Sequence, residues 1–131
     1  KYLKKHGRPK SVEELRQHAQ VPYLTESGPL PWRLKGPGGE FLFPAAGRLQ
    51  AASGNVLSRA VTEGLGIAQT YEPHIAEFIR RKDVEVILPS SEPEPRQVHA
   101  LFARQKAELP KVRVFVDFFA AVFRDAASQV R

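Results

Sequence analysis

Residues 47–71, GRLQAASGNVLSRAVTEGLGIAQTY, decide the fold class that this sequence predicts. The run 47–52 is a strand candidate, and Ser53 after it is a residue type that caps helix N-termini. The next stretch carries apolar residues at helical spacing, and Gly64 stands where helices commonly end in the left-handed conformation. A second, mostly apolar strand, 66–71, follows. A strand, a helix and a strand in succession indicate an α/β fold with parallel strands.

The segment before this stretch predicts a short helix and a strand. Ser11-Val12-Glu13-Glu14 has the pattern of a capping box, in which a serine hydroxyl and a glutamate three residues later each accept a backbone N–H. We therefore expect a helix to about Ala19, with Leu15 facing inward. Residues 21–24 follow as a strand, and the glycine and prolines of 25–31 predict a loop.

A hairpin is predicted around Gly36-Pro37-Gly38-Gly39, because this turn-forming run divides the apolar-rich segment 32–44. Trp32 can pair across the turn with Phe41 or Phe43. We interpret Trp32 as a packing residue rather than as a surface for stacking a ligand.

Two further helices are predicted downstream. Glu72-Pro73 opens the first, because proline is favoured at the first helical position, and Pro110 starts the second. Residues 84–88 and 97–103 are strand candidates on either side of a proline-rich loop. The last helix has the strongest periodic signal in the chain, an apolar stripe at i, i+3, i+4 spacing. Its members are Val112, Phe115, Val116, Phe119 and Phe123.

The composition predicts one soluble globular domain. Of 131 residues, 42% are hydrophobic and 26% charged, so the chain can bury a core and bulk disorder is not expected. The absence of cysteine excludes disulfides, thiolate metal sites and cysteine nucleophiles, and it suits a reducing cytoplasm. No apolar run is long enough to span a bilayer, so no membrane partner is expected. Because the chain contains no Met, even at its start, we expect it to be a fragment of a longer protein.

The net charge of +6 is scattered along the chain. Its one cluster is the basic N-terminus, residues 1–10, which has no apolar segment after it and is therefore not a signal peptide. Elsewhere Lys and Arg alternate with Glu and Asp, and no helix carries a continuous basic stripe. We interpret the charge as solvated surface in preference to a nucleic-acid contact.

No catalytic or metal-binding motif is present. The histidines form no metal-like pairing, and there is no Gly-x-Ser-x-Gly elbow, P-loop or complete Gly-x-Gly-x-x-Gly. We therefore predict no enzyme, no metal and no cofactor. Ser53-Gly54-Asn55 is the one place of interest, because a strand ends and a helix begins there, and free helix amides favour an anion. A capping residue followed by a polar turn is the plainer interpretation of the same residues.

Four stretches of the chain, in order, carry a recognisable set of motifs. They are Tyr2-Leu3-Lys4-Lys5-His6-Gly7 with residues 11–15 after it, Pro31-Trp32-Arg33-Leu34, residues 47–67 with Gly64-Leu65-Gly66-Ile67, and residues 110–118. Together they resemble the effector-binding region of LysR-type transcriptional regulators. The resemblance covers nearly the whole chain.

The resemblance implies two α/β subdomains joined by two crossover strands, similar to type II periplasmic binding proteins and Rossmann-like, with a mostly parallel sheet. Residues 1–100 would be the second subdomain, and residues 101–131 would be the crossover and the C-terminal helix of the first. The helix-turn-helix domain and most of the first subdomain would be absent. Such a chain would contact DNA only through the absent N-terminal domain, and the protein would act in the bacterial cytoplasm.

The resemblance also implies where a small-molecule effector, often a carboxylate or an aromatic acid, would bind. The cleft-facing loops would be 25–28, 53–55 and 69–71, each of which follows a predicted strand. Ser53 and Asn55 would hydrogen-bond an anionic or polar group, Thr25 and Ser27 would bound the pocket, and Gln69 or Tyr71 would set specificity. Residues 69–73 are more polar than is usual in the family, so effector identity does not transfer. The complete expected set is Thr25, Ser27, Gly28, Ser53, Gly54, Asn55, Gln69 and Tyr71.

The implied function is ligand sensing. Effector binding would favour one arrangement of a homodimer or tetramer and so change transcription. The apolar stripe of the last helix would drive self-association of this chain. Three alternatives remain: a periplasmic-type solute-binding protein of the same architecture, an α/β enzyme, and a nucleic-acid binder that uses residues 1–10.

Overall fold

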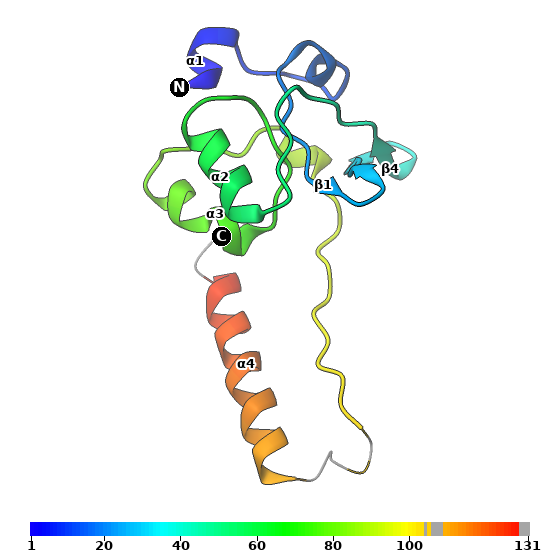
Figure 1. The fold of residues 1–131 in the computed structure, drawn as a ribbon, viewed down its shortest axis with the longest axis vertical. Helices are drawn as coiled ribbons and strands as arrows, with labels where there is room; N and C mark the ends of the chain where they lie inside the picture. The colour runs from blue at the N-terminus through cyan, green and yellow to red at the C-terminus, as the bar shows by residue number, and fades with distance from the viewer. Residues whose placement is uncertain (104, 106–108, 129–131) are drawn as a thin grey trace. The chain divides into compact units, whose positions relative to one another are not determined.

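The computed structural model describes residues 1–103, 105 and 109–128, with side chains as far as residue 124. Contacts divide the chain into two compact units, Lys1–Glu94 and Pro95–Arg131. The elements of both units can be followed in Figure 1.

Residues 19–24 form the centre of the first unit and are paired on both sides. The Val21 N–H donates to the Ile67 carbonyl at 2.8 Å, within a parallel bridge between Gln20 and Ile67. On the other side, the Ala51 N–H donates to the Pro22 carbonyl at 3.2 Å, within a parallel bridge between Tyr23 and Ala51. The parallel direction expected from the sequence is therefore present.

The extent of the strands predicted at 21–24, 47–52 and 66–71 is wrong. Single bridges stand in their place, and the named strand at this point is β1 (Leu24–Thr25), which pairs antiparallel with β2 (Gly28–Pro29). Pro22, in the middle of the central segment, has no N–H to give to a longer ladder. The loop expected at 25–31 is thus a minimal hairpin.

Two glycines let the flanking segments approach the central one closely. A Cβ added at Gly47 would lie 1.8 Å from the Gln20 carbonyl oxygen, and one at Gly66 would lie 2.5 Å from the Ala19 carbonyl oxygen. Neither distance is possible for a real side chain. Both positions therefore require glycine for packing.

The hairpin predicted around residues 36–39 is confirmed. Strands β3 (Trp32–Gly36) and β4 (Gly39–Phe43) pair antiparallel, with Trp32 opposite Phe43. The two rings stack with centroids 5.8 Å apart, and Trp32 is only 4% exposed. Trp32 is therefore a packing residue, as expected, and its partner is Phe43 rather than Phe41.

The N-terminal part contains helix α1 (Tyr2–His6) and the 3-10 helix η1 (Glu13–Gln17). The helix expected to about Ala19 is shorter, because the Ala19 N–H donates to the Tyr2 hydroxyl and the Ala19 carbonyl accepts from Ile67. The expected capping box is only partly present: Ser11 forms no cap of η1, although the Glu14 carboxylate accepts the Lys10 N–H at 2.8 Å.

Helices α2 (Gly54–Thr62) and α3 (Glu72–Arg80) pack against each other, and the buried Ser58 hydroxyl donates to the His74 carbonyl at 2.8 Å. The predicted end of α2 is confirmed: Gly64 has φ +82°, its N–H donates to Val61, and the Leu65 N–H donates to Ala60. This is the Schellman arrangement, which satisfies carbonyls of the last helical turn.

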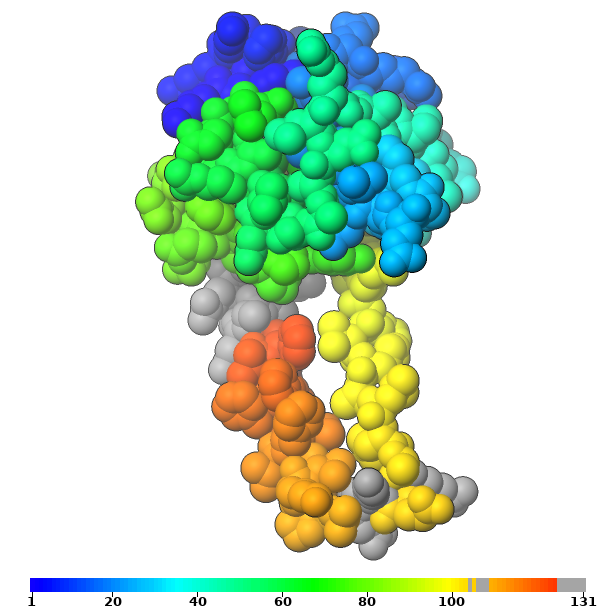
Figure 2. All heavy atoms as spheres, in the orientation of Figure 1, coloured from blue at the N-terminus to red at the C-terminus, as the bar shows by residue number. Residues whose placement is uncertain are grey.

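Two apolar clusters hold the first unit together. The larger one joins α1, η1 and the hairpin, and the smaller one joins α2 to the central segment. In the space-filling view the blue N-terminal residues lie directly against the green region of α2 (Figure 2). The larger cluster contains Tyr2, Leu15, Trp32, Leu34, Phe43, Ala45 and Ile67, and the smaller one contains Val21, Ala51, Leu57 and Ala60.

Neither residues 84–88 nor residues 97–103 form the strand that the sequence predicts. Residues 84–88 lead to a short 3-10 helix, η2 (Pro89–Ser91), and 97–103 are extended and exposed. Among the described residues neither run is paired with a strand, and an unpaired run gains no ladder hydrogen bonds. In the second unit, helix α4 (Pro110–Ser128) begins at Pro110 as predicted.

Candidate functional site

Three loops lie at one edge of the paired segments of the first unit. Residues 25–28 follow the central segment, residues 53–55 follow the bridge at Ala51, and residues 69–71 follow the bridge at Ile67. Parallel segments end at the same edge, so the bridges bring these loops together. They contain all eight residues that the sequence points to.

The first loop is closed by its own hydroxyl groups. The Thr25 hydroxyl donates to the Gly28 carbonyl at 2.8 Å, and the Ser27 hydroxyl lies 3.0 Å from the Thr25 oxygen. Because the Thr25 proton is used by Gly28, Ser27 is the donor of the second bond. Gly28 has φ +112°, a conformation that favours glycine, so it is required for the turn rather than for its lack of bulk.

The second loop leads into the N-terminus of α2. Ser53 has the extended conformation of an N-cap, but its side chain makes no capping hydrogen bond, and the first turn of α2 contains no acidic residue. The Ser53 hydroxyl, the exposed Asn55 amide and the amides of the first turn are thus donors in one place. The helix dipole adds a partial positive charge there.

His74 is a neighbour of this turn that the sequence does not reveal. A Cβ added at Gly54 would lie 2.7 Å from the His74 ring, so the α3 imidazole occupies the space that a larger residue would need. The Ser58 hydroxyl fixes the backbone of α3 at the same residue. No local pattern could have indicated this contact, because Gly54 and His74 are twenty positions apart and lie on different helices.

Gln69, in the third loop, is committed to the backbone of β3. The Arg33 N–H donates to the Gln69 side-chain oxygen at 2.9 Å, and the Gln69 side-chain N–H donates to the Arg33 carbonyl at 2.6 Å. The side-chain amide thus forms with Arg33 the same pair of hydrogen bonds that the backbone of a neighbouring strand would form. Tyr71 differs, because the residue is 56% exposed, and the hydrogen bond that its carbonyl accepts from the His74 N–H is the only one it forms with the described residues.

Charged residues hold the neighbouring hairpin in place. The Arg33 guanidinium, together with the Glu94 N–H, lowers the pKa of Glu40 from its ordinary 4.5. Lys35 donates to the Glu94 carboxylate at 2.6 Å, and this hydrogen bond raises the pKa of Lys35 from its ordinary 10.5. Glu94, the last residue of the first unit, is tied to both strands of the hairpin.

The site offers hydrogen-bond donors and partial positive charge. Within the described part of the chain, no group of three His, Cys, Asp or Glu side chains is placed to hold a metal ion. Over the same residues, no helix combines the length and apolarity needed to cross a membrane. The arrangement suits the binding of a polar or anionic small molecule.

Comparison with known proteins identifies relatives of the chain. The family model described as "LysR substrate binding domain" matches residues 1–124. An uncharacterised HTH-type transcriptional regulator of Escherichia coli, YhjC, is 27% identical over 126 residues, which are 95% of this chain and 42% of that protein. The chain thus spans less than half of the curated relative that it matches.

Solved structures agree with the family match. Full-length AphB, a Vibrio cholerae virulence activator of the LTTR family, superposes with a TM-score of 0.74 at 31% identity, over 89% of this chain and 40% of that one. The regulatory domain of AphB from Vibrio vulnificus gives 0.73 at 30% identity, over 92% and 60%. CrgA, a LysR-type regulator of Neisseria meningitidis, gives 0.71 at 29% identity, over 89% and 40%.

These neighbours share the α/β fold of LysR regulatory domains, which is of the type II periplasmic-binding-protein kind. The fold class expected from the sequence is therefore confirmed, although the described parallel pairings are short. The matched family is one of transcription regulators and not of enzymes. With a family model that matches residues 1–124, the chain belongs to the LysR substrate-binding domain family.

Proposed function

We propose that this chain is the effector-sensing part of a transcription regulator and that it binds a small anionic effector with the loops 25–28, 53–55 and 69–71. The observation that carries the proposal is the start of α2, where free amides, the Ser53 hydroxyl and the Asn55 amide meet without an acidic residue to neutralise them. A carboxylate placed there would accept several hydrogen bonds at once.

The loops have different roles in this proposal. Ser53 and Asn55 contact the anionic group, Gly54 leaves room for His74, and the exposed Tyr71 ring contacts the rest of the effector and sets specificity. Thr25, Ser27 and Gly28 form a pre-shaped rim, because their hydrogen bonds already fix the turn. Gln69 fixes the position of its loop through Arg33.

The proposal retains the division into residues 1–100 as a second subdomain and 101–131 as a segment that returns to a first subdomain. The effector would lie between the two subdomains and favour one arrangement of a dimer or tetramer. DNA would be contacted by a separate N-terminal domain, in the cytoplasm. The family match favours this regulator over a periplasmic-type solute-binding protein.

A thermal-shift screen of small carboxylates and aromatic acids tests the proposal, on this chain and on a longer chain that contains both subdomains. An effector at a hundredfold excess over its Kd should stabilise the longer chain by about 2.7 kcal/mol, and this chain weakly or not at all. In the longer chain, the double variant Ser53→Ala, Asn55→Ala should abolish this thermal shift, whereas Ser90→Ala in η2 should preserve it. An unchanged shift in the double variant would refute the assigned roles.

A further inference from the structure

The β3–β4 hairpin is held by residues from two distant parts of the chain. Gln69, in one of the three candidate loops, is hydrogen-bonded to the N–H and the carbonyl of Arg33 at 2.9 and 2.6 Å. At the second contact, the Glu94 N–H donates to the Glu40 carboxylate at 2.8 Å, and the Lys35 ammonium group donates to the Glu94 carboxylate at 2.6 Å. The hairpin therefore contacts both a candidate effector loop and the last residue of the first unit.

Within the hairpin these two contacts are connected. The Arg33 guanidinium of β3 donates to the Glu40 carboxylate of β4, and the same carboxylate accepts the Glu94 N–H. Both hydrogen bonds lower the pKa of Glu40, that of Arg33 more than that of Glu94. In the strand pairing, Lys35 lies opposite Glu40, so the backbone ladder joins the same positions. A continuous series of hydrogen bonds thus runs from Gln69 through Arg33 and Glu40 to Glu94.

The segment that leads to Glu94 also packs against the hairpin. The 3-10 helix η2 contacts β3, and Ile87 and Leu88 pack against the larger apolar cluster, to which the hairpin contributes. Leu88 has φ +50° and ψ +53°, a left-handed conformation that is strained for a residue with a Cβ. Such strain persists only where the surroundings fix it, so the hairpin and the core determine the course of residues 87–94.

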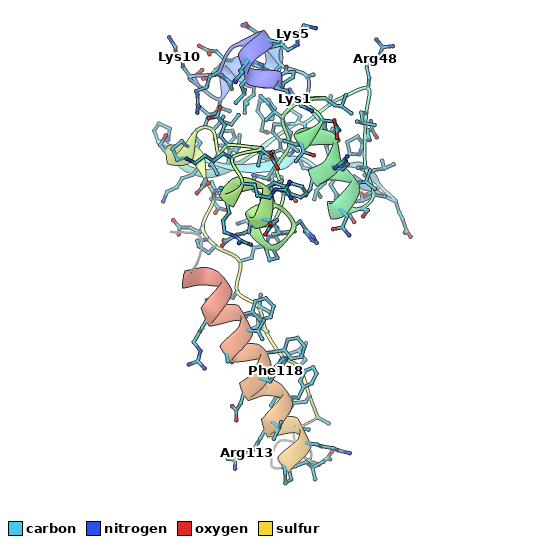
Figure 3. The ribbon with its side chains drawn as sticks, turned by 90° about the vertical axis from the view of Figure 1, so that its left-hand side faces the viewer. Lys1, Lys5, Lys10, Arg48, Arg113 and Phe118 are labelled. Carbon is cyan, nitrogen blue, oxygen red and sulfur yellow. The ribbon has the colours of Figure 1, made fainter. Side chains whose placement is uncertain are left out.

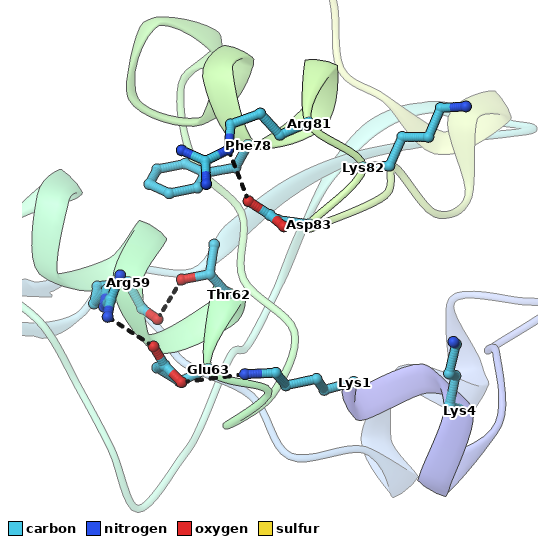
Figure 4. Close-up of a pocket in the computed structure, with 9 residues that line it drawn as sticks. All are labelled: Lys1, Lys4, Arg59, Thr62, Glu63, Phe78, Arg81, Lys82 and Asp83. Carbon is cyan, nitrogen blue, oxygen red and sulfur yellow. Dashed lines mark hydrogen bonds and ion pairs between the residues drawn. The ribbon is translucent and has the colours of Figure 1, made fainter.

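Other parts of the first unit are joined by contacts that bypass residues 89–94. The Glu63 carboxylate, at the end of α2, forms ion pairs with Lys1 at 3.4 Å and with Arg59 at 2.9 Å (Figure 4). Among the described residues, every hydrogen bond from 89–94 to a distant part of the chain goes to the hairpin. Within that part of the chain, the hairpin is therefore the hydrogen-bonded route from the loop 69–71 to Glu94.

We propose that the β3–β4 hairpin transmits a displacement of the loop 69–71 to Glu94, the residue at which the chain leaves the first unit. The inference rests on the proposed function for the cause of the displacement, which is effector binding. Networks of hydrogen bonds between rigid elements carry coupling of this kind. Effector binding at the loops thus redirects the chain after Glu94 and favours one arrangement of the protein over another.

Amide chemical shifts of this chain test the coupling without an effector. Gln69→Leu keeps a side chain of similar size but removes both hydrogen bonds to Arg33. The Glu94 amide resonance should then move at least about halfway from its parent position to its position in Glu40→Leu, where the N–H has lost its acceptor. Gln50→Leu, the same substitution at an exposed position, should leave this resonance in place. A Glu94 resonance that stays at its parent position in Gln69→Leu would overturn the proposal.

Coupling is reciprocal, so a change at Glu94 should also be detected at the loop. Lys35→Gln and Glu94→Gln each break the ion pair between these two residues and should shift the Gln69 side-chain amide resonances in the same direction. A direct effect of charge would shift them in opposite directions, because one variant removes a positive and the other a negative charge. This second result would contradict the proposal.

Two further variants make the same charge changes at exposed positions elsewhere. Lys5→Gln changes a side chain of α1 that lies at the surface of the first unit (Figure 3), and Glu92→Gln changes a carboxylate two residues before Glu94. Both should leave the Gln69 resonances in place. All variants should keep the amide resonance of the buried Ala60 at its parent position, and a change that extends to Ala60 would indicate general loss of structure and count against transmission.

The result is separate from that of the effector screen. If the Glu94 and Gln69 resonances respond as expected and no effector is found, the coupling stands and the proposed function fails. If an effector is found and these resonances do not respond to the variants, the effector site stands and the coupling through the hairpin is refuted.

Discussion

Gln20 is a buried polar side chain that has a structural role. It is 7% exposed; its amide N–H donates to the Leu15 carbonyl at 2.8 Å, and its oxygen accepts the Ala46 N–H at 2.9 Å. The side chain thus joins η1 to the segment after β4. Since buried polar groups that lose their partners are costly, this one amide contributes more than an exposed amide can.

Gln20→Ala should lower the free energy of unfolding by about 3 kcal/mol, because the Leu15 carbonyl and the Ala46 N–H both lose their partner. Urea unfolding of the parent and the variant measures the difference. The control Gln50→Ala removes an exposed amide with a single bond of 3.3 Å to the Gly47 carbonyl and should change stability by no more than about 0.5 kcal/mol. Equal effects in the two variants would contradict the role given to Gln20.

Glu40 should make the hairpin sensitive to acid. Its pKa is lowered in the folded chain, chiefly by the Arg33 hydrogen bond, so its contribution to stability is present above pH 4.5 and lost as the pH falls through the folded pKa. The stability difference between the parent and Glu40→Gln should therefore be largest above pH 4.5 and shrink below it. Urea unfolding between about pH 3 and pH 7 measures this difference.

The control for this acid dependence is Glu26→Gln, at an exposed carboxylate without a recorded partner among the described residues. Its stability should stay parallel to that of the parent over the whole range. A Glu40→Gln profile parallel to the parent would show that the Arg33 contact is not formed in solution.

The pH dependence of the Lys35 contribution has the opposite direction. The pKa of Lys35 is raised by Glu94, so its contribution to stability is present below pH 10.5 and lost as the pH rises through the folded pKa.

At the scale of elements, the pairing of segments depends on glycines that permit close approach. Gly47→Ala places a methyl group where the Gln20 carbonyl oxygen already lies, and should cost at least about 3 kcal/mol. Gly38→Ala meets no atom within 4 Å and should cost no more than about 0.5 kcal/mol. Circular dichroism during urea unfolding measures both, and a Gly47→Ala chain as stable as Gly38→Ala would mean that the segment after β4 lies elsewhere.

Elements with local signals are predictable from the sequence, and elements that depend on distant partners are not. The Gly36–Gly39 turn specifies the β3–β4 hairpin, Gly64 specifies the end of α2, and Pro110 specifies the start of α4. Residues 84–88 have the composition of a strand, yet a strand also needs a neighbour, and hydropathy does not supply one.

The candidate site could also be predicted from the sequence only in part. Its position after successive parallel segments follows from the order of elements, which is why the three loops could be named in advance. The commitment of Gln69 to Arg33 could not, because the two residues are 36 positions apart. His74 could not be predicted either, because it contacts Gly54 from a different helix.

At the scale of the whole molecule, α4 has a large apolar surface. Within its stripe, Phe115, Phe119 and Phe123 are exposed by 58%, 41% and 45%, and the first two rings lie 4.6 Å apart. Exposed apolar areas of this kind favour association with another surface. Under the proposed function, the natural partners of this helix belong to the first subdomain or to another copy of the chain.

We expect this chain to self-associate through α4 at micromolar concentration. Phe115→Ser combined with Phe119→Ser should return it to a monomer, because the stripe loses its two central rings. Light scattering after size exclusion measures the mass. Lys111→Ser combined with Arg113→Ser, at exposed polar positions of the same helix, should leave the association unchanged. A parent chain that is monomeric at all concentrations would rule out this expectation.

The two hydrogen bonds between Gln69 and Arg33 couple the movement of the loop 69–71 to that of the hairpin. The Gln69 side chain is hydrogen-bonded to both the N–H and the carbonyl of Arg33 in β3. A shift of the loop 69–71 must therefore either break these two hydrogen bonds, each worth about 1 kcal/mol, or move the β3–β4 hairpin together with the loop. The stacked pair of Trp32 and Phe43 would move with that hairpin. Trp32 is the single tryptophan of the chain, so a change in its fluorescence would report a displacement of the loop 69–71.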